Sequence, residues 1–354
     1  MALTPAGGAA RIQFARAKIA RTPLAVLPTP LVEAKRLAEA LGTGPLFVKR
    51  DDLTGFAFGG NKARLLEFLL AAAIADGADT LLTGGAAGSN FCAATAAAAC
   101  HAGLRCELVI AGQPVPPGPA LGLAASWGAV LHWTGSPERE SVDARLPEAA
   151  AKLSADGRRP YLIPRGGATA LGAIGYALAA AELHEQLAQR GLRDIRVIVP
   201  VGSGGTLAGL IAGHVLLGRP WTLVGCSASR PPQPVTRQVL ALARQCLSML
   251  GPAEADPPGD GPPGDGLPGA GTVGDGMAEV IVADARGPGH GLPSAEGTVA
   301  AEQALRTEGL MVDPVYTAKA LALVPRYSSD GNVVFWHTGG LLDAVAAATA
   351  EGRP

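Results

Sequence analysis

Residues 196–213 read RVIVPVGSGGTLAGLIAG, an apolar run that passes through a glycine turn into a second apolar segment. The first part is typical of a buried strand and the last part of a helix, so the stretch predicts a strand–turn–helix unit. Such units build α/β folds around mainly parallel sheets, which bind ligands at the carboxyl ends of their strands. The glycine turn at 202–206 is therefore a candidate ligand site.

The same alternation extends over most of the chain. Five further apolar runs have the length of buried strands, and they lie at 46–50, 80–85, 106–112, 222–228 and 333–340. Helical spacing of Ala and Leu predicts helices over 64–75, 93–102 and 172–190. We therefore predict an α/β fold with open, twisted, mostly parallel sheets.

Composition and charge narrow the classes of function. The chain has 29 basic and 30 acidic residues without a long run of one sign, so neither nucleic acid nor an acidic membrane is expected as a partner. The longest charge-free stretches are interrupted by Gly, Ser, Asn or Pro, and residues 1–23 lack the apolar core of a secretory signal. The cytoplasm is the expected compartment.

Cysteine and histidine are few and scattered. Neither HExxH nor CxxC spacing occurs, so no metal site is expected. The five cysteines are interpreted as small buried side chains in a reducing compartment.

Residues 251–277 differ from the rest, with fifteen Gly or Pro in twenty-seven positions. Such a segment has little to bury and opposes both helix and strand. We interpret it as a flexible surface loop inside a domain rather than a domain boundary.

The glycine turn has the chemistry of a phosphate site. Its glycines allow successive backbone N–H groups to face one ligand, and Ser203 and Thr206 add hydroxyl donors at the start of a helix. The Walker pattern is absent, and Leu207 occupies the third glycine position of the dinucleotide pattern. A tight turn without a ligand is the alternative.

A lysine begins the apolar helix in FAFGGNKARLLEFLL (56–70). Burial lowers the pKa of an amine and makes Lys62 a candidate nucleophile. A buried amine and a phosphate cradle are two of the groups that pyridoxal phosphate needs, beside partners for its pyridine nitrogen and 3'-oxygen. The alternative is a lysine whose amine reaches solvent from the helix end.

Six stretches in order carry a resemblance to a known family. They are KRDDLTGFAFGGNKARLLEF (49–68), GSN (88–90), PRGGATALGAIGYALAAAEL (164–183), VGSGGTLAGL (201–210), DPVYTAKAL (313–321) and FWHTGG (335–340). From Thr22 to Leu341, apart from 251–277, the chain resembles the D-cysteine desulfhydrase and 1-aminocyclopropane-1-carboxylate deaminase family. These are pyridoxal-phosphate enzymes of the tryptophan-synthase-β type, fold type II.

The resemblance implies an organisation as well as a cofactor. Pyridoxal 5'-phosphate would lie between a larger domain, residues 1–57 and 166–354, and a smaller one, residues 58–165. A homodimer acting on a small amino-acid substrate is expected.

Matching residues imply three catalytic roles. Lys62 matches the Schiff-base lysine, Ser89 the serine near the substrate carboxylate, and Tyr316 an active-site tyrosine.

The resemblance also implies the cofactor-binding residues. They are Lys62, Asn61, Asn90, Gly202, Ser203, Gly204, Gly205, Thr206 and Thr338. Among these, residues 202–206 match the phosphate loop. Asn90 matches the partner of the 3'-oxygen, and Thr338 matches the hydroxyl at the pyridine nitrogen.

The substrate side departs from the family pattern. Gly88 and Phe91 replace Gln and His of the usual QSNH, and Ala93 and Ala94 replace an Arg and a Gln. His290 stands where the family has a tyrosine near the substrate. With an ordinary pKa near ~6.5, His290 is a candidate for proton transfer; an inert replacement is the alternative.

Several polar residues near these motifs are interpreted as structural. Arg64 and Glu67 are expected to form a surface or interface pair, and Asp51 and Asp52 to cap turns. His337 should point away from Thr338 along an alternating strand.

The predicted activity is a lyase reaction. Thr338 is a weaker partner for a pyridinium than a carboxylate, and Thr317 stands where the deaminase subgroup has Glu. Both favour loss of a β-substituent, as from D-cysteine, giving an α-keto acid and ammonia. Two alternatives stay open. One is a diverged enzyme catalysing β-replacement, racemisation or ring formation. The other is a pyridoxal-phosphate-binding protein without turnover.

Overall fold

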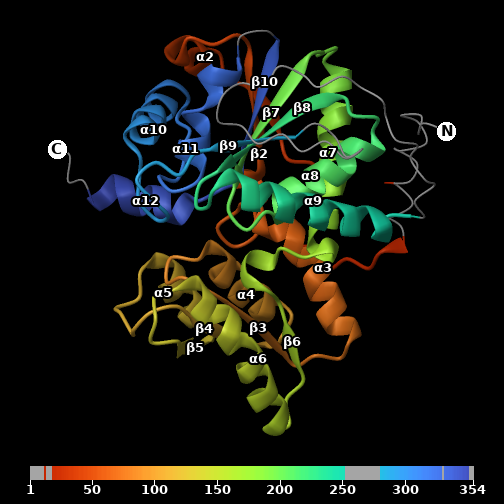
Figure 1. Ribbon diagram of the computed structural model, residues 1–354, viewed down its shortest axis with the longest axis vertical. Coiled ribbons are helices and arrows are strands. Elements are labelled where there is room, and N and C mark those ends of the chain that lie inside the picture. The colour runs from red at the N-terminus through yellow and green to blue at the C-terminus, as the bar shows by residue number, and fades with distance from the viewer. Residues whose placement is uncertain (1–11, 13–17, 252–279, 329–330, 351–354) are drawn as a thin grey trace.

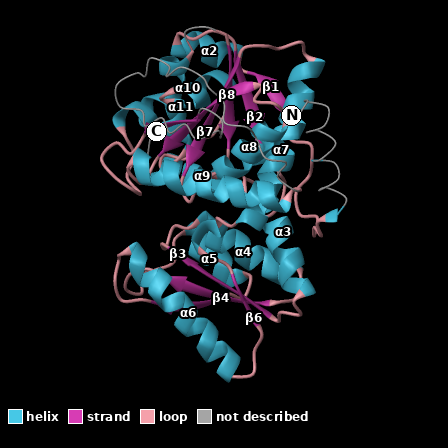
Figure 2. Ribbon diagram, turned by 45° about the vertical axis from the view of Figure 1, so that its right-hand side comes forward, coloured by secondary structure: helices cyan, strands magenta, loops and turns pink. Residues whose placement is uncertain are grey.

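The computed structural model describes residue 12 and residues 18–251, 280–328 and 331–350 (Figure 1). These residues form two β-sheets, each covered by helices, and the two parts lie one above the other (Figures 1 and 2). Helix α3 (Lys62–Ala75) joins them, because it packs against α7 (Ala170–Gln189) of one part and α4 (Asn90–His101) of the other.

The larger sheet has six strands. Their order is β1 (Leu31–Glu33), β2 (Leu46–Arg50), β10 (Asn332–His337), β7 (Ile195–Val201), β8 (Trp221–Ser227) and β9 (Val280–Asp284). Strand β1 is antiparallel to β2, and the other neighbours pair in parallel. Most of these strands are almost continuously apolar because both faces of the sheet are covered.

Helices cover both faces of this sheet, since successive strand residues point to opposite sides. In β7, Val197 and Val199 belong to one core and Ile198 to the other. The first core is closed by α7 (Ala170–Gln189), α8 (Gly205–Leu216) and α9 (Pro232–Met249). The second is closed by α2 (Lys35–Leu41), α10 (Ala295–Glu308) and α11 (Thr317–Leu321).

The smaller sheet has four parallel strands. Their order is β5 (Val130–Trp133), β4 (Arg105–Ile110), β3 (Thr80–Gly85) and β6 (Pro160–Leu162). Helices α4 (Asn90–His101) and α5 (Pro119–Ser126) pack on one face and α6 (Arg139–Ala155) on the other. Helix α12 (Leu341–Ala350) follows β10 and packs against α5, which adds a second contact between the two parts.

The predicted fold class is confirmed, and all six predicted strands are present. Four strands were not predicted, namely β1, β5, β6 and β9. The predicted helices start too late, since α3 begins at Lys62, α4 at Asn90 and α7 at Ala170. Short 3-10 turns complete the fold: η1 (Asp51–Leu53), η2 (Arg165–Gly167) and η3 (Val324–Tyr327).

Other predictions have different outcomes. The domain boundaries stay a prediction. Of the predicted loop 251–277, Gly251 is described, and residues 252–277 lie outside the described residues. Four of the five cysteines are buried as predicted, but Cys100 is exposed. In the described ranges, no helix combines the length and apolarity needed to cross a membrane.

The predicted surface pair of Arg64 and Glu67 is wrong. Both residues are buried, with exposed fractions of 2% and 1%. Arg64 donates to Asp51 and Glu182 instead, through Nε–Oδ2 and Nη1–Oε2 distances of 3.0 Å each. Glu67 accepts hydrogen bonds from the backbone N–H groups of residues 24 and 25. These partners lie far away in sequence, so helical spacing alone did not indicate them.

The predicted turn caps are also wrong. Asp51 begins η1, is fully buried, and its carboxylate accepts hydrogen bonds from other side chains, including Tyr176 at 2.5 Å and Trp336 at 2.9 Å. Asp52 pairs with the guanidinium of Arg50 at 2.7 Å. Neither carboxylate lines the cavity described below.

Candidate active site

A cavity of about 510 Å³ lies between the two parts, at the carboxyl ends of strands from both sheets. Residues 84 and 85 of β3 line one side, and residues 200 and 202 at the end of β7 line the other. Thr338, directly after β10, completes the junction. Its size and position are those of a small-ligand site in an α/β protein.

A glycine turn delivers Lys62 to this cavity. Gly59 and Gly60 have φ of +76° and +99°, where residues with a Cβ are strained. A Cβ on Gly59 would lie 2.1 Å from the carbonyl oxygen of Asp52, and one on Gly60 2.9 Å from that of Thr338. The turn therefore needs glycine to pack against both backbones and start α3 at the cavity wall.

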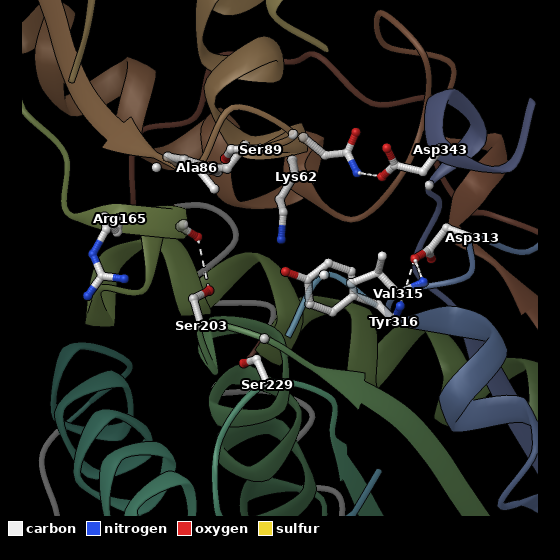
Figure 3. A pocket seen from close by; sticks show the side chains of 18 of the residues that line it. Lys62, Ala86, Ser89, Arg165, Ser203, Ser229, Asp313, Val315, Tyr316 and Asp343 are labelled. Atoms are coloured by element: carbon white, nitrogen blue, oxygen red, sulfur yellow. Dashed lines mark hydrogen bonds between the residues drawn. The ribbon is translucent and has the colours of Figure 1, made fainter. Parts of the chain in front are cut away.

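The Lys62 side chain points into the middle of the cavity, between Ser89 on one side and Ser203 and Ser229 on the other (Figure 3). Within the described parts of the chain, its amine has no hydrogen-bond or ion-pair partner. Burial lowers the pKa of this amine to about 8, although the negative charge of Asp313 acts in the opposite direction. An amine of this pKa is available as a nucleophile near neutral pH.

Asn61 connects the lysine turn to the glycine loop. Its backbone N–H donates to the carbonyl of Thr338 at 2.9 Å, and its Nδ2 donates to Thr206 Oγ1 at 2.8 Å. Thr206 lies in the first turn of α8 and is only 7% exposed. Asn61 thus holds the starts of α3 and α8 at one place.

The predicted phosphate loop begins at the cavity wall. Gly202 and Ser203 line the cavity, whereas Gly204, Gly205 and Thr206 form the start of α8 and are not among its lining residues. A Cβ on Gly202 would lie 3.1 Å from the ring of Tyr316, so glycine keeps this approach open. Gly204 has φ of +99° at the helix N-terminus.

Ser89 and Asn90 occupy the N-terminus of α4 on the opposite wall. Ser89 Oγ caps the helix by accepting from the N–H of Cys92 at 3.2 Å. Asn90 Nδ2 donates to Asp343 at 2.8 Å, and the Asn90 Oδ1 atom is buried without a partner among the described residues (Figure 3). Burial raises the pKa of the Asp343 carboxyl, with Asn90 opposing and Asp313 reinforcing the shift.

Tyr316 and His290 form a pair at the cavity rim. Tyr316 Oη lies 3.2 Å from His290 Nε2, and the two rings meet edge to face. Burial, and then the charge of Asp313, raises the pKa of Tyr316 to about 12. Partial burial, followed by the positive charges of Arg139 and Lys319, lowers the pKa of the His290 imidazole. At neutral pH the pair is therefore a phenol beside an uncharged imidazole.

Asp313 fixes the turn that carries Tyr316. Its carboxylate accepts from the backbone N–H groups of Val315 and Tyr316 at 3.0 and 2.7 Å. Thr317, whose identity separates the subgroups of the resembling family, is fully buried and donates its hydroxyl to Asp313. Thr317 therefore supports the turn and does not line the cavity.

Thr338 and His337 point to different places. Thr338 lines the cavity, and its hydroxyl has no hydrogen-bond partner within the described residues. His337 is 1% exposed, and its Nε2 lies 2.7 Å from the carbonyl oxygen of Met311. The predicted orientation of His337 away from the site is therefore confirmed.

The residues that depart from the family pattern fall into two groups. Phe91 lines the cavity and is 2% exposed, and Gly88 lines it with open space where a Cβ would be. Ala93 and Ala94 are buried and do not line the cavity. The first pair therefore reshapes the cavity, and the second packs α4.

Sequence reasoning missed several charged residues of the cavity. They are Arg139, Arg165, Asp313 and Asp343. Asp313 and Arg165 lie inside quoted stretches, at 313–321 and 164–183, and Asp343 follows HTGG closely, so these three could have been indicated by the motifs. Arg139 belongs to no motif, so it carried no such signal.

These residues fit pyridoxal phosphate. Lys62 offers an amine that no other described residue engages, and the loop 202–206 offers backbone N–H groups at a helix start, with no Cβ at Gly202 to fill the space. Thr338 offers a hydroxyl, and Asn90 offers an amide nitrogen that donates one hydrogen to Asp343 and has a second for the ring oxygen. The donors lie on separate walls of one cavity, as an aldehyde, a phosphate and a ring nitrogen require.

Comparisons with known proteins agree with this chemistry. Residues 22–339 match the family described as pyridoxal-phosphate dependent enzyme. A D-cysteine desulfhydrase of Klebsiella pneumoniae (strain 342) is 36% identical over 326 residues, which cover 88% of this chain and 92% of the relative. The crystal structure of an ACC deaminase homologue has a TM-score of 0.83 at 28% identity, over 96% of this chain and 98% of its own.

A more distant structure has the same fold. Maize serine racemase has a TM-score of 0.64 at 16% identity, over 97% of this chain and 96% of its own. The match of residues 22–339 and the relative at 36% identity cover nearly the whole chain, including the lysine turn and the glycine loop. The chain belongs to the pyridoxal-phosphate-dependent enzymes, with fold type II.

Proposed function

We propose that this enzyme is a lyase that removes a β-substituent from a small amino acid, such as D-cysteine, and yields an α-keto acid and ammonia. One observation carries the proposal: the amine of Lys62, which has no partner among the described residues, shares a cavity with the Tyr316–His290 pair. The relative at 36% identity is a D-cysteine desulfhydrase, which supports the same reaction class.

We assign cofactor binding to the residues on three walls of the cavity. The backbone of 202–206 would bind the phosphate, Thr338 the pyridine nitrogen, and Asn90 the ring oxygen. Bound pyridoxal phosphate supplies an electron sink for the bonds at the substrate α-carbon. Asn61 would act through Thr206, since their 2.8 Å hydrogen bond connects the lysine turn to the phosphate loop.

Lys62 is the proposed base for the α-proton. Its pKa of about 8 means that the amine takes up and returns a proton readily near neutral pH. Ser89 would bind the substrate carboxylate from the N-terminus of α4, where backbone N–H groups and the helix dipole favour an anion.

The Tyr316–His290 pair is the proposed proton donor to the leaving group. Tyr316 keeps its proton at neutral pH because its pKa is raised to about 12. His290 is uncharged, and its Nε2 lies 3.2 Å from Tyr316 Oη, so it would accept a hydrogen bond from the phenol. Because His290 is exposed at the rim, it could also pass a proton from solvent to Tyr316 after the phenol has given up its own. A departing thiolate would leave as a neutral thiol.

A second candidate function is another reaction at the α- and β-carbons of an amino-acid substrate, such as β-replacement, racemisation or ring formation. Phe91 and Gly88 favour it, because both line the cavity and make it less polar than the resembling family's QSNH loop. Replacing Gly88 with Gln and His290 with Tyr should then raise activity on D-cysteine. An unchanged rate would count against this candidate.

The first test is the absorbance spectrum of purified protein with pyridoxal phosphate, before and after D-cysteine is added. We expect a visible band that is absent from Lys62→Ala, and release of sulfide and pyruvate on addition of D-cysteine. A panel of β-substituted D- and L-amino acids extends the test. If the band forms and no member of the panel reacts, the lyase proposal fails.

Three further expectations belong to the same proposal. We propose that the protein works in the cytoplasm as a homodimer, and that residues 58–165 form its smaller domain. Light scattering of the purified protein would test the dimer.

A further inference from the structure

Arg139 is a charged side chain at the cavity wall that forms no ion pair with any described residue. It is the first residue of α6, half-buried, and lines the cavity. In the parts of the chain that the structure describes, its guanidinium makes no hydrogen bond or ion pair. The other arginines nearby are engaged: Arg165 donates to both carboxylate oxygens of Asp143 at 2.6 Å, and Arg145 pairs with Glu148 at 2.9 Å.

The surroundings of Arg139 are unfavourable for a cation. It stands at the N-terminus of a helix, where the dipole favours negative charge. Arg165 lines the same cavity, and the nearby Arg230 donates to the carbonyl of Gly202 at 3.1 Å, while its buried Nε has no partner among the described residues. Burial, and then the charge of Arg165, lowers the pKa of Arg139, and the opposing charges of Glu140 and Asp143 do not cancel this shift. An anion in the cavity would relieve this repulsion.

The guanidinium of Arg139 lies at a different part of the cavity from the two other proposed anion sites. The proposed site for the substrate carboxylate is at Ser89, and that for the cofactor phosphate at 202–206. The positive charge of Arg139 acts instead on His290 and Tyr316, where the leaving group is proposed to depart. A group bound there belongs to the far end of a substrate side chain.

We infer that the substrate carries a second acidic group, a carboxylate or a phosphate, on its side chain, and that Arg139 binds it with Arg165 adding positive charge. The inference rests on the proposed function in that the substrate is an amino acid bound to the cofactor. It narrows the substrate class from small amino acids to acidic ones. It also explains why this wall contains a guanidinium that pairs with none of the described residues.

The test compares pairs of ligands that differ only in this charge and carry no leaving group. Aspartate against asparagine, and glutamate against glutamine, as D and L forms, are titrated into the cofactor-loaded protein while the visible spectrum is followed. We expect the acid of at least one pair to bind roughly 10-fold to 100-fold more tightly than its amide, as for a charge-assisted hydrogen bond. Arg139→Gln should abolish this ratio, and Arg139→Lys should retain part of it.

Arg145→Gln is the matched control, because Arg145 lies on the same helix, is exposed, and pairs outside the cavity. It should leave the ratio unchanged. Equal binding of acid and amide, or a preference that survives Arg139→Gln, overturns the inference. If Arg139→Gln weakens binding of pyridoxal phosphate and leaves the acid-to-amide ratio as it was, Arg139 serves the cofactor and the inference is also overturned.

The outcomes separate this inference from the proposed function. If the protein binds acids more tightly than amides but eliminates no β-substituent, the second acidic group is upheld and the lyase reaction is refuted. If it turns over D-cysteine but binds acids and amides equally, the lyase reaction is upheld and the second acidic group is refuted.

Discussion

Replacing Asp51 with Asn removes one charge from a buried network while nearly keeping the side-chain shape. The carboxylate of Asp51 is completely buried and accepts hydrogen bonds from four side chains, at distances of 2.5 to 3.0 Å. The donors are Thr29, Arg64, Tyr176 and Trp336. The network also holds Lys49 and Glu182, so its two cations and two anions balance.

The pKa of Asp51 allows the loss of stability in Asp51→Asn to be estimated. Burial alone would raise this pKa, but Arg64, Lys49 and Tyr176 together outweigh burial and lower it from 3.8 to about 2. This difference contributes roughly 2 kcal/mol to the free energy of unfolding at neutral pH. Asn also leaves a cation of the network without its counter-charge, and breaking a buried ion pair typically costs about 3 to 5 kcal/mol. We expect a loss in that range at pH 7.

Urea unfolding measures this loss, with Asp52→Asn as the matched control. The Asp52 side chain is 17% exposed and pairs with Arg50 near the surface, so its loss should cost about 1 kcal/mol or less. Because the folded-state pKa of Asp51 is depressed, its contribution is present above the unfolded pKa and is lost as the pH falls towards 2. The difference between wild type and Asp51→Asn should therefore shrink on acidification. Equal effects of the two substitutions at pH 7 would refute the reasoning.

Three further outcomes are expected at the site. Gly59→Ala forces a Cβ against the carbonyl of Asp52, 2.1 Å away, at a φ of +76°, so it should cost about 1 to 3 kcal/mol of stability and weaken binding of pyridoxal phosphate measured by fluorescence titration. The rate at which the protein without cofactor binds pyridoxal phosphate should rise with pH to a plateau, with a midpoint near pH 8, because the lowered pKa of Lys62 sets the fraction of uncharged amine. A midpoint near the ordinary pKa of 10.5 would contradict the effect of burial on Lys62. Tyr316→Phe should lower kcat roughly 100-fold or more while the cofactor spectrum is retained, and His290→Gln should alter the pH profile of kcat without changing the spectrum.

The sequence predicted those strands that are marked by a continuous apolar run of their own. The strands β2 and β3 are continuous apolar runs, and their predicted bounds are those observed. Strands β1 and β6 have three residues each, and β5 contains His132, so their apolar runs are too short to stand out from loops. These strands form through neighbours that are already in place, which is a property of the sheet rather than of their residues.

The same distinction applies to the site. Glycine turns and the lysine are recognisable because backbone conformation and chemistry restrict the residue type. Arg139 reaches the cavity from α6 and lies in none of the motifs, so no spacing in the sequence indicates it, whereas Asp343 on α12 is indicated only by its place shortly after HTGG. The prediction for Arg64 was wrong for a related reason, since its partner Glu182 is 118 residues away on α7.

The buried network has a consequence for Lys62 that stability alone does not explain. A packed apolar cluster could hold α3, β2 and α7 together at similar or greater stability. Ion pairs differ in being directional: Arg64 must face both Asp51, directly after β2, and Glu182 on α7. Lys62 stands two residues earlier, about 200° around the helix at 3.6 residues per turn. Fixing the rotation of α3 through Arg64 therefore also fixes the direction of Lys62, towards the cavity and away from the core.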